Sequence, residues 1–238
     1  AFAPTADAYR ALLAGEDEQD RQARPYPFFL AAQLGEDPAT LGDRGGWLAE
    51  WKWDGIRAQL IRRDRVLLWS RGEELITHQF PEIVAAAGGL PEGVVLDGEV
   101  LLWRDGRPRP FSSLQRRLNR KAAPPPQLSL FGEESPVFMA FDLLEDGGAD
   151  VRSRGARERR GRLEAVVGSL DGGAILCSPL LADDTWEALA ASRSTSRERG
   201  VEGVMLKHAE SPYAAGRVKP EGSHGWWKWK IDPFTADA

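Results

Sequence analysis

The sequence predicts an α+β fold in which two packed, mainly antiparallel β-sheets are flanked by helices. Most of its apolar segments alternate apolar and polar residues with period two, or form short apolar runs, as strands do. Only a few segments between the strands carry helix signals. The chain has 238 residues, 42% of them hydrophobic and 28% charged, so it can bury a substantial core. Many strands with a few interspersed helices favour packed sheets with helices outside.

The expected strands follow the alternation along the chain. From Trp47 to Trp69 it indicates a strand, a turn at Asp54-Gly55, a second strand, a tight turn near Arg63-Asp64 and a third strand. The remaining strand predictions are a strand pair over 94–103, a strongly apolar strand over 137–144, and closing strands over 201–207 and 226–231.

Three helices are expected between these strands, after a helix-prone segment at the start of residues 1–25 that leads into an extended stretch. Pro81 suits the first position of a helix that runs to about Ala87. A second helix covers 154–167, and a third follows the capping box formed by Asp184 and Glu187 and runs to about 197. Residues 122–135, rich in proline and polar residues, are expected to form a mobile loop.

Composition excludes several classes of protein. The single cysteine, Cys177, cannot form an internal disulfide and suits a reducing cytoplasm. No apolar run reaches transmembrane length, and the N-terminus carries no signal-peptide pattern. A net charge of −5 does not indicate a domain that wraps nucleic acid unaided. Because the chain opens on Ala1, we expect it to be a piece of a longer protein.

The most informative segment is Glu-Trp-Lys-Trp-Asp-Gly-Ile-Arg, residues 50–57. On a strand, Glu50, Lys52 and Asp54 share one face, while the two tryptophans anchor the other. A lysine nucleophile must be a neutral amine, and nearby cations or partial desolvation make that form accessible. Lys52 with Arg57 just beyond it therefore indicates a nucleophile in a phosphate site. The alternative is a solvated strand lysine beside an Asp-Gly hairpin turn.

Two further segments place carboxylates in apolar strands. Asp97 and Glu99 share one strand face, where Glu99 suits ribose hydroxyls and either acid suits a metal; the alternative is a solvated hairpin turn. Glu202 opens an apolar strand on the face of Val204 and Leu206, which suits a carboxylate facing Mg²⁺. A strand-end glutamate in solvent is the alternative for Glu202.

Other candidates carry cations or an aromatic ring. Arg71 can clamp a phosphate, or be an exposed turn arginine. Phe141 can stack on a purine, or simply fill the core. Lys228 and Lys230 alternate with tryptophans, so they form a positive wall suited to a phosphate chain, or an interfacial strand with extended lysines.

In this order, the motifs Lys-x-Asp-Gly-x-Arg, Ser-Arg-Gly, Asp-Gly-Glu, Phe-Asp-Leu-Leu, Glu-Gly-Val-Met-Leu-Lys and Trp-Lys-Trp-Lys resemble those of the ATP-dependent DNA ligases over residues 50–230. Residues 111–121 and the lead-in Arg-Pro-Tyr-Pro look like the bacterial multidomain type. The resemblance implies an adenylation domain with the covalent nucleotidyltransferase fold.

The resemblance also implies roles for the site residues. Lys52 would attack the α-phosphate of ATP and hold AMP, which passes to the 5′-phosphate of a nick that the 3′-hydroxyl then seals. The remaining implied contacts are adenine for Glu50, Phe141 and Met205, the ribose–phosphate region for Arg57, ribose for Glu99, AMP or the nick phosphate for Arg71, Mg²⁺ for Glu202 with Glu99, and the α-phosphate for Lys228 and Lys230.

The implied partners are ATP, Mg²⁺ and nicked double-stranded DNA, for a monomer without membrane attachment in a bacterial cytoplasm, associated with the nucleoid. Residues 1–46 are expected to be a lead-in, 47–233 the adenylation domain, and 234–238 the start of a linker to an OB-fold domain. The full-length protein would add that OB-fold domain and an N-terminal DNA-binding domain. The chain by itself is therefore expected to bind ATP or AMP and to seal nicks poorly.

Some alternatives stay open at this point. An RNA ligase or a capping-type enzyme shares the lysine motif, and a non-catalytic nucleotide-binding scaffold could retain the fold. The family often has a basic residue shortly before the final lysine pair, and either Arg217 or Lys219 could take its place.

Overall fold

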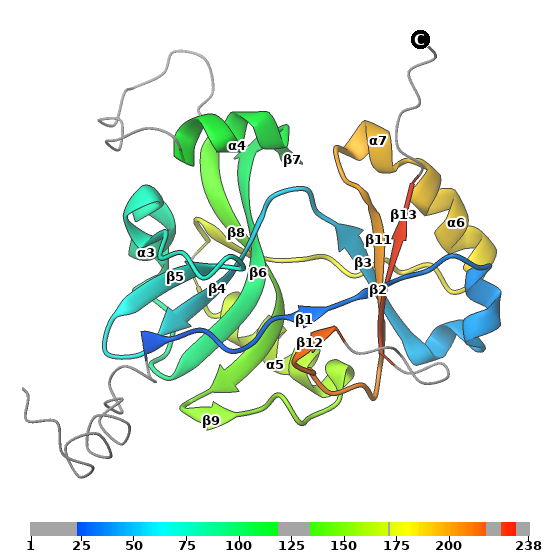
Figure 1. Ribbon diagram of the computed structural model, residues 1–238, viewed down its shortest axis with the longest axis horizontal. Coiled ribbons are helices and arrows are strands. Elements are labelled where there is room, and N and C mark those ends of the chain that lie inside the picture. The colour runs from blue at the N-terminus through cyan, green and yellow to red at the C-terminus, as the bar shows by residue number, and fades with distance from the viewer. Residues whose placement is uncertain (1–22, 119–133, 171, 218–224, 232–238) are drawn as a thin grey trace, which may run out of the picture.

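The computed structural model describes residues 23–118, 134–170, 172–217 and 225–231. These residues form a seven-stranded, a four-stranded and a two-stranded sheet, with helices on the outside (Figure 1). Most neighbouring strands run antiparallel. The predicted fold class is therefore confirmed. The expected helix near the N-terminus, most of the expected loop and the expected linker lie outside the described residues.

The seven-stranded sheet consists of β4 (Ile56–Arg62), β5 (Val66–Ser70), β6 (Val94–Arg104), β7 (Arg107–Pro108), β8 (Ser135–Asp146), β9 (Ala149–Asp150) and β10 (Ile175–Cys177). Its strand order is β10-β8-β6-β4-β5, with β7 paired to β6 and β9 to β8. The β8–β10 pair is parallel, and the other pairs are antiparallel.

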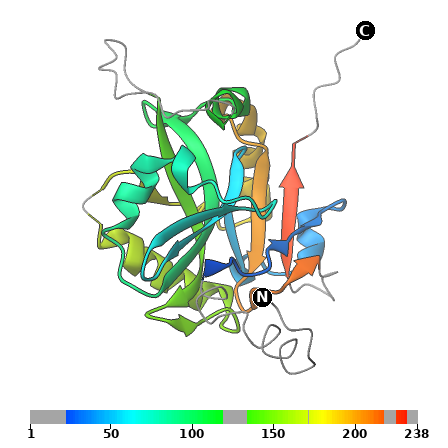
Figure 2. The ribbon, with the colours of Figure 1, turned by 60° about the vertical axis from the view of Figure 1, so that its left-hand side comes forward.

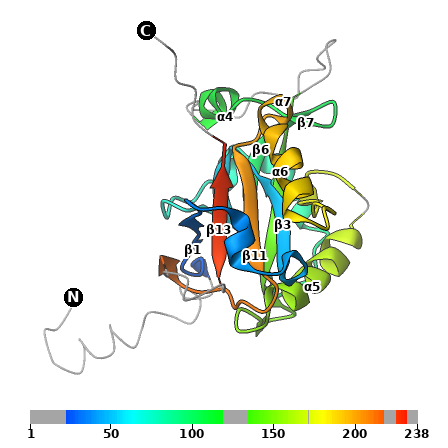
Figure 3. The ribbon, with the colours of Figure 1, turned by 90° about the vertical axis from the view of Figure 1, so that its right-hand side faces the viewer.

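The four-stranded sheet consists of β2 (Ala32–Gln33), β3 (Trp47–Lys52), β11 (Gly203–His208) and β13 (Trp226–Lys230). Its order is β2-β13-β11-β3, and Figure 3 shows β13, β11 and β3 side by side. Two short strands, β1 (Phe29–Leu30) and β12 (Gly216–Arg217), pair in parallel. In Figure 2 the orange β11 lies between the red β13 and the green strands of the larger sheet.

Helices cover the outer faces of both larger sheets. The helices α3, α4 and α5 pack on the seven-stranded sheet, and α6 packs on β11 of the other. The bounds are α3 Pro81–Ala87, α4 Phe111–Leu118, α5 Ala156–Gly168, α6 Trp186–Ser194 and α7 Ser196–Arg199, with 3₁₀ turns at Pro38–Leu41, Arg44–Gly46 and Thr77–Gln79.

The core is divided between the faces of the sheets. One apolar cluster lies between the seven-stranded sheet and its helices and includes Phe80, Leu96 and Leu163. A second joins the two larger sheets, because Trp51 of β3 and Met139 of β8 belong to it. This second cluster fixes the two sheets relative to each other.

Residues 94–103 form one continuous strand, so the predicted strand pair is wrong. Asp97-Gly98 is not a turn: Gly98 pairs with Ala58 on one side and Ala140 on the other, in the middle of the sheet. A Cβ on Gly98 would lie 2.6 Å from the Phe138 ring, so glycine is required by close approach.

The helix predictions hold with small corrections. Pro81–Ala87 is helical as expected, and the second helix starts and ends slightly later than predicted. The predicted cap of the third helix is displaced by one residue, because the Thr185 side chain accepts a hydrogen bond from the Ala188 amide at 3.1 Å. That segment is two helices, α6 and α7, which meet at Thr195.

Candidate functional site

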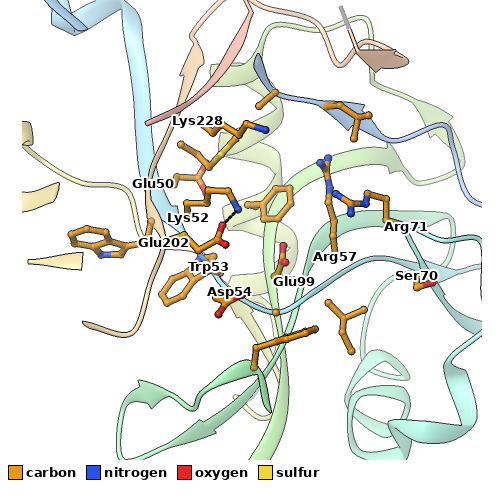
Figure 4. Close-up of a pocket in the computed structure, with 18 of the residues that line it drawn as sticks. Glu50, Lys52, Trp53, Asp54, Arg57, Ser70, Arg71, Glu99, Glu202 and Lys228 are labelled. Atoms are coloured by element: carbon orange, nitrogen blue, oxygen red, sulfur yellow. Dashed lines mark ion pairs between the residues drawn. The ribbon is translucent and has the colours of Figure 1, made fainter. Parts of the chain in front are cut away.

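A cavity of about 640 Å³ opens between the two larger sheets. Lys52, Glu202 and Lys228 lie on one side of it and Arg57 and Arg71 on the other (Figure 4). The cavity collects every predicted site residue, namely Glu50, Lys52, Arg57, Arg71, Glu99, Phe141, Glu202, Met205, Lys228 and Lys230. What each residue does there stays a prediction.

Lys52 is the last residue of β3, at the point where the chain crosses from one sheet to the other. The Asp54-Gly55 turn does not close a hairpin, because β3 and β4 belong to different sheets. A Cβ on Gly55 would lie 2.3 Å from the Val100 carbonyl oxygen, so only glycine allows this close crossing. Trp53 is buried behind the crossing and donates a hydrogen bond to Ser178 Oγ at 3.0 Å.

Main-chain hydrogen bonds hold Glu202 beside Lys52, at the end of β3. Its amide donates to the Lys52 carbonyl at 2.8 Å, and its carbonyl accepts from Ile231 at 3.1 Å. Its carboxylate forms ion pairs with Lys52 and, at 3.1 Å, with Lys230. Burial raises the pKa of Glu202, but hydrogen bonds from the two lysines outweigh burial and hold the pKa below its usual value.

The strand-face prediction for Glu202 is wrong, although the residue does line the cavity. Val204 and Leu206 are buried in the apolar cluster behind the sheet, while Met205 faces the cavity. The alternation breaks at Gly203, whose φ of +139° is accessible to glycine and strained for other residues. This break turns Glu202 to the cavity face.

Arg57 is oriented by a buried carboxylate and a buried phenol. Asp97 is fully buried and accepts two hydrogen bonds from the guanidinium, from Nε at 3.3 Å and from Nη2 at 2.8 Å. Tyr213 donates to the same carboxylate at 2.7 Å. Burial lowers the pKa of Arg57, but the charge of Asp97 outweighs burial and raises it, so Arg57 brings a permanent positive charge to the cavity.

Two acids on the cavity wall have raised pKa values. Burial raises the pKa of Glu99 from 4.5 to about 7, against the opposing charges of Lys52 and Arg57. Burial and the charge of Glu202 raise the pKa of Asp54. Glu99 therefore changes its charge near neutral pH, as residues in functional sites often do.

Phe141 reaches the cavity from an irregular point in β8. Opposite it, Asp97 pairs with Asp142 and Gly98 pairs with Ala140, so Phe141 is the extra residue of a β-bulge. The Phe141 carbonyl accepts a hydrogen bond from Lys207 Nζ at 2.6 Å.

The carboxylates fit the way that proteins hold Mg²⁺ together with phosphates. Among the described residues, no group of three or more His, Cys, Asp or Glu is placed to bind a metal ion by itself. Magnesium on a nucleotide takes one or two carboxylates and fills its remaining positions with phosphate oxygens and water. Glu99 and Glu202 line the same cavity and fit that mode of binding.

Several cavity residues were not predicted from the sequence. Lys207 and Trp226 line it, as do Leu30 and Ala31 of the lead-in. Lys207 lies two residues after Met205 and therefore shares its strand face, so strand alternation starting from Met205 would have indicated Lys207 as well. Arg217 lies in β12, and Lys219 lies outside the described part of the chain.

Among the helices that the structure describes, none is long and apolar enough to cross a membrane.

Comparison with known proteins gives consistent matches. The family model "ATP dependent DNA ligase domain" matches residues 30–230. The DNA ligase of Haloferax volcanii is 36% identical over 214 residues, which are 87% of this chain and 34% of that protein. The probable DNA ligase of Opitutus terrae is 37% identical over 199 residues, which are 72% of this chain and 19% of that protein. This chain thus spans about a third or less of the length of these relatives.

Two solved structures have the same fold. Mycobacterial DNA ligase D complexed with ATP and MES superposes with a TM-score of 0.64 and 28% identity, over 86% of this chain and 60% of that chain. Chlorella virus DNA ligase-adenylate superposes with a TM-score of 0.62 over 86% of this chain and 69% of that chain, and at 19% identity it is evidence for the fold alone.

Proposed function

We propose a nucleotide-transfer function for this chain, because the chain belongs to the family of ATP-dependent DNA ligase domains. In this proposal it is the adenylation domain of a DNA ligase and takes AMP from ATP onto Lys52. The observation that carries the proposal is the position of Lys52, which lines the same cavity as Arg57, Lys228 and Lys230. These four cations, together in one cavity of nucleotide size, suit a polyphosphate ligand.

The first step forms a covalent bond to the lysine. Lys52 Nζ, as a neutral amine, attacks the α-phosphorus of ATP, and its proton passes to solvent. A P–N bond forms, the bond between the α-phosphorus and the bridging oxygen breaks, and pyrophosphate leaves with that electron pair. Positioning and charge neutralisation supply most of the rate enhancement in such phosphoryl transfers.

The other cavity residues bind and orient the nucleotide in this proposal. Lys228 and Lys230 face the α-phosphate, and Arg57 the ribose and phosphates. Mg²⁺, held by Glu202 and Glu99 together with phosphate oxygens, would neutralise charge on the phosphate chain. Contacts to the base come from Phe141, Met205 and Glu50, while Glu99 also accepts from ribose hydroxyls and Arg71 contacts AMP or the nick phosphate.

The acceptor in this proposal is the 5′-phosphate of nicked double-stranded DNA. AMP passes to that phosphate, and the 3′-hydroxyl then displaces AMP and seals the strand. The matched relatives are named DNA ligases, which disfavours an RNA ligase or a capping-type enzyme. We place the reaction in the cytoplasm, on the DNA of the nucleoid, with the chain acting as a monomer within a longer protein.

The test is the intact mass of the chain before and after incubation with ATP and Mg²⁺. We expect a gain of one AMP that Lys52→Arg abolishes, because arginine keeps the positive charge beside Glu202 but lacks the attacking amine. A gain that persists in this variant would exclude Lys52 as the nucleophile. Absence of both the gain and ATP binding would refute the proposed function.

A further inference from the structure

Lys207 is a buried cation at one end of the cavity that the proposed reaction does not use. Lys207 is 3% exposed, and in the strand register of β11 it pairs with Leu48 of β3 on one side and Trp226 of β13 on the other. Its Nζ lies 4.7 Å from the ring centre of Phe141 and 4.5 Å from that of Trp226, both within cation–π range. A lysine so far from water needs partners of opposite charge or polarity.

The charged partner of Lys207 is Glu50, whose carboxylate is also buried. Lys207 Nζ lies 2.9 Å from Glu50 Oε1, and Arg160 Nη1 lies 3.7 Å from Oε2. Neither contact is aligned as a hydrogen bond, so both carboxylate oxygens are buried acceptors without a donor among the described residues. Because Glu50 lines the cavity, a ligand can supply the missing donor.

The second partner of Lys207 is the Phe141 carbonyl oxygen, at 2.6 Å. Phe141 is the extra residue of the bulge in β8. One ammonium group, which has three donors and no acceptor, thus connects the acceptor Glu50 on one sheet with the aromatic residue Phe141 on the other.

We propose that Lys207 is a positioning residue for nucleobase selection: it holds the Glu50 carboxylate and the Phe141 backbone in place, so that Glu50 presents an acceptor to an exocyclic amino group. This inference rests on the proposed nucleotide-binding function. A base with a 6-amino group donates to Glu50, whereas a base without that group leaves the buried acceptor unpaired. Lys207 acts through Glu50, and its removal leaves the carboxylate free to turn toward Arg160.

The experiment compares two nucleotides that differ only at the position in question. ATP carries the 6-amino group, and purine riboside triphosphate has hydrogen there. Calorimetric titration gives the dissociation constant of each, without requiring the transfer reaction. For the unchanged chain we expect ATP to bind about tenfold or more tightly, because a hydrogen bond to a charged group is at stake.

The variants Lys207→Met, Glu50→Leu and the double variant separate positioning from a structural role. We expect each single variant to bind the two nucleotides within about threefold of each other, and the double variant to lose no further selectivity. A merely structural lysine would weaken both nucleotides equally and keep their ratio. A ratio that survives in Lys207→Met, or a ratio near one in the unchanged chain, would overturn the inference.

Two controls protect the reading of this experiment. Lys207→Met leaves a buried carboxylate near one remaining cation, so its fold is checked by thermal denaturation. If it does not fold, the double variant, which replaces the pair by apolar side chains, decides the outcome together with Glu50→Leu. Failure of the unchanged chain to bind ATP would count against the proposed function itself.

Discussion

Replacing Tyr213 with phenylalanine removes one oxygen atom that joins the lead-in segment to the cavity. The Tyr213 hydroxyl donates to Asp97 Oδ2 at 2.7 Å and accepts from the Phe29 amide at 3.1 Å. All three residues are buried, with Asp97 fully so. The substitution keeps the ring and its packing against Phe29 and Trp226. Its effect therefore measures the two hydrogen bonds.

The expected loss of stability follows from those two bonds. A hydrogen bond to a charged acceptor contributes about 1.5–3 kcal/mol, and a buried N–H left without a partner costs about 1–3 kcal/mol. Their sum is an upper range, since single substitutions seldom exceed 4–5 kcal/mol and the Phe29 amide can recover part of its loss by relaxation. We therefore expect Tyr213→Phe to lower the free energy of unfolding by about 3 kcal/mol.

The assay is urea unfolding followed by circular dichroism, with Tyr26→Phe as the matched control. Tyr26 also donates to a carboxylate, Glu145 at 2.8 Å, but it is only partly buried. Its loss should be smaller than that of Tyr213→Phe, because water can replace the hydrogen bond of a partly exposed hydroxyl. A loss for Tyr213→Phe no larger than that for Tyr26→Phe would refute the reasoning. In Tyr213→Phe the free energy of nucleotide binding should change less than the free energy of unfolding, because Asp97 keeps both hydrogen bonds from Arg57.

Two further predictions concern Glu99 and Gly203. Burial raises the pKa of Glu99 from 4.5 to about 7, so between these values the folded chain keeps a proton that the unfolded chain has released. The contribution of Glu99 to the free energy of unfolding is full below about pH 4.5 and falls by about 3 kcal/mol as the pH rises to about 7, at 1.36 kcal/mol per pKa unit. Urea unfolding at about pH 5 and about pH 8 measures this fall, and Glu99→Gln should remove it. An unchanged pH dependence in Glu99→Gln would contradict the assignment. Gly203→Ala would place a Cβ 2.3 Å from the Trp229 carbonyl oxygen at a φ of +139°. We expect Gly203→Ala to lower the free energy of unfolding by about 2 kcal/mol or more and to weaken ATP binding, measured by calorimetry. Gly35→Ala is the control and should be near neutral, because a Cβ at Gly35 would have no atom within 4 Å. Equal effects of the two substitutions would show that the backbone at Gly203 is not special.

Local sequence pattern was sufficient wherever one strand decides which way a side chain points. In β13, period two placed Lys228 and Lys230 on the cavity face and Trp227 and Trp229 in the cluster behind it, as the structure has them. Pro81 likewise marks the first residue of α3. The helix α4 was missed, although Phe111, Leu114 and Leu118 have helical spacing, because the basic residues around them dominate the segment.

Local pattern failed where the backbone departs from regular geometry. Glu202 faces the cavity because Gly203 breaks the alternation, and Phe141 is the extra residue of a bulge. Both irregularities depend on a neighbouring strand, in one case β13 and in the other β6. The residue pattern of a single segment does not indicate which strand will pack beside it.

The sequence by itself determined the α+β class, most element positions and many of the residues that meet in the cavity, because these depend on side-chain periodicity and residue chemistry. Only the tertiary structure decided that Asp54-Gly55 crosses between two sheets instead of closing a hairpin, and that Lys207, Glu50 and Phe141 meet at one end of the cavity. Those contacts join segments far apart in the chain. Strand pairing, sheet packing and the exclusion of water create these contacts, and the residue pattern of one segment predicts none of the three.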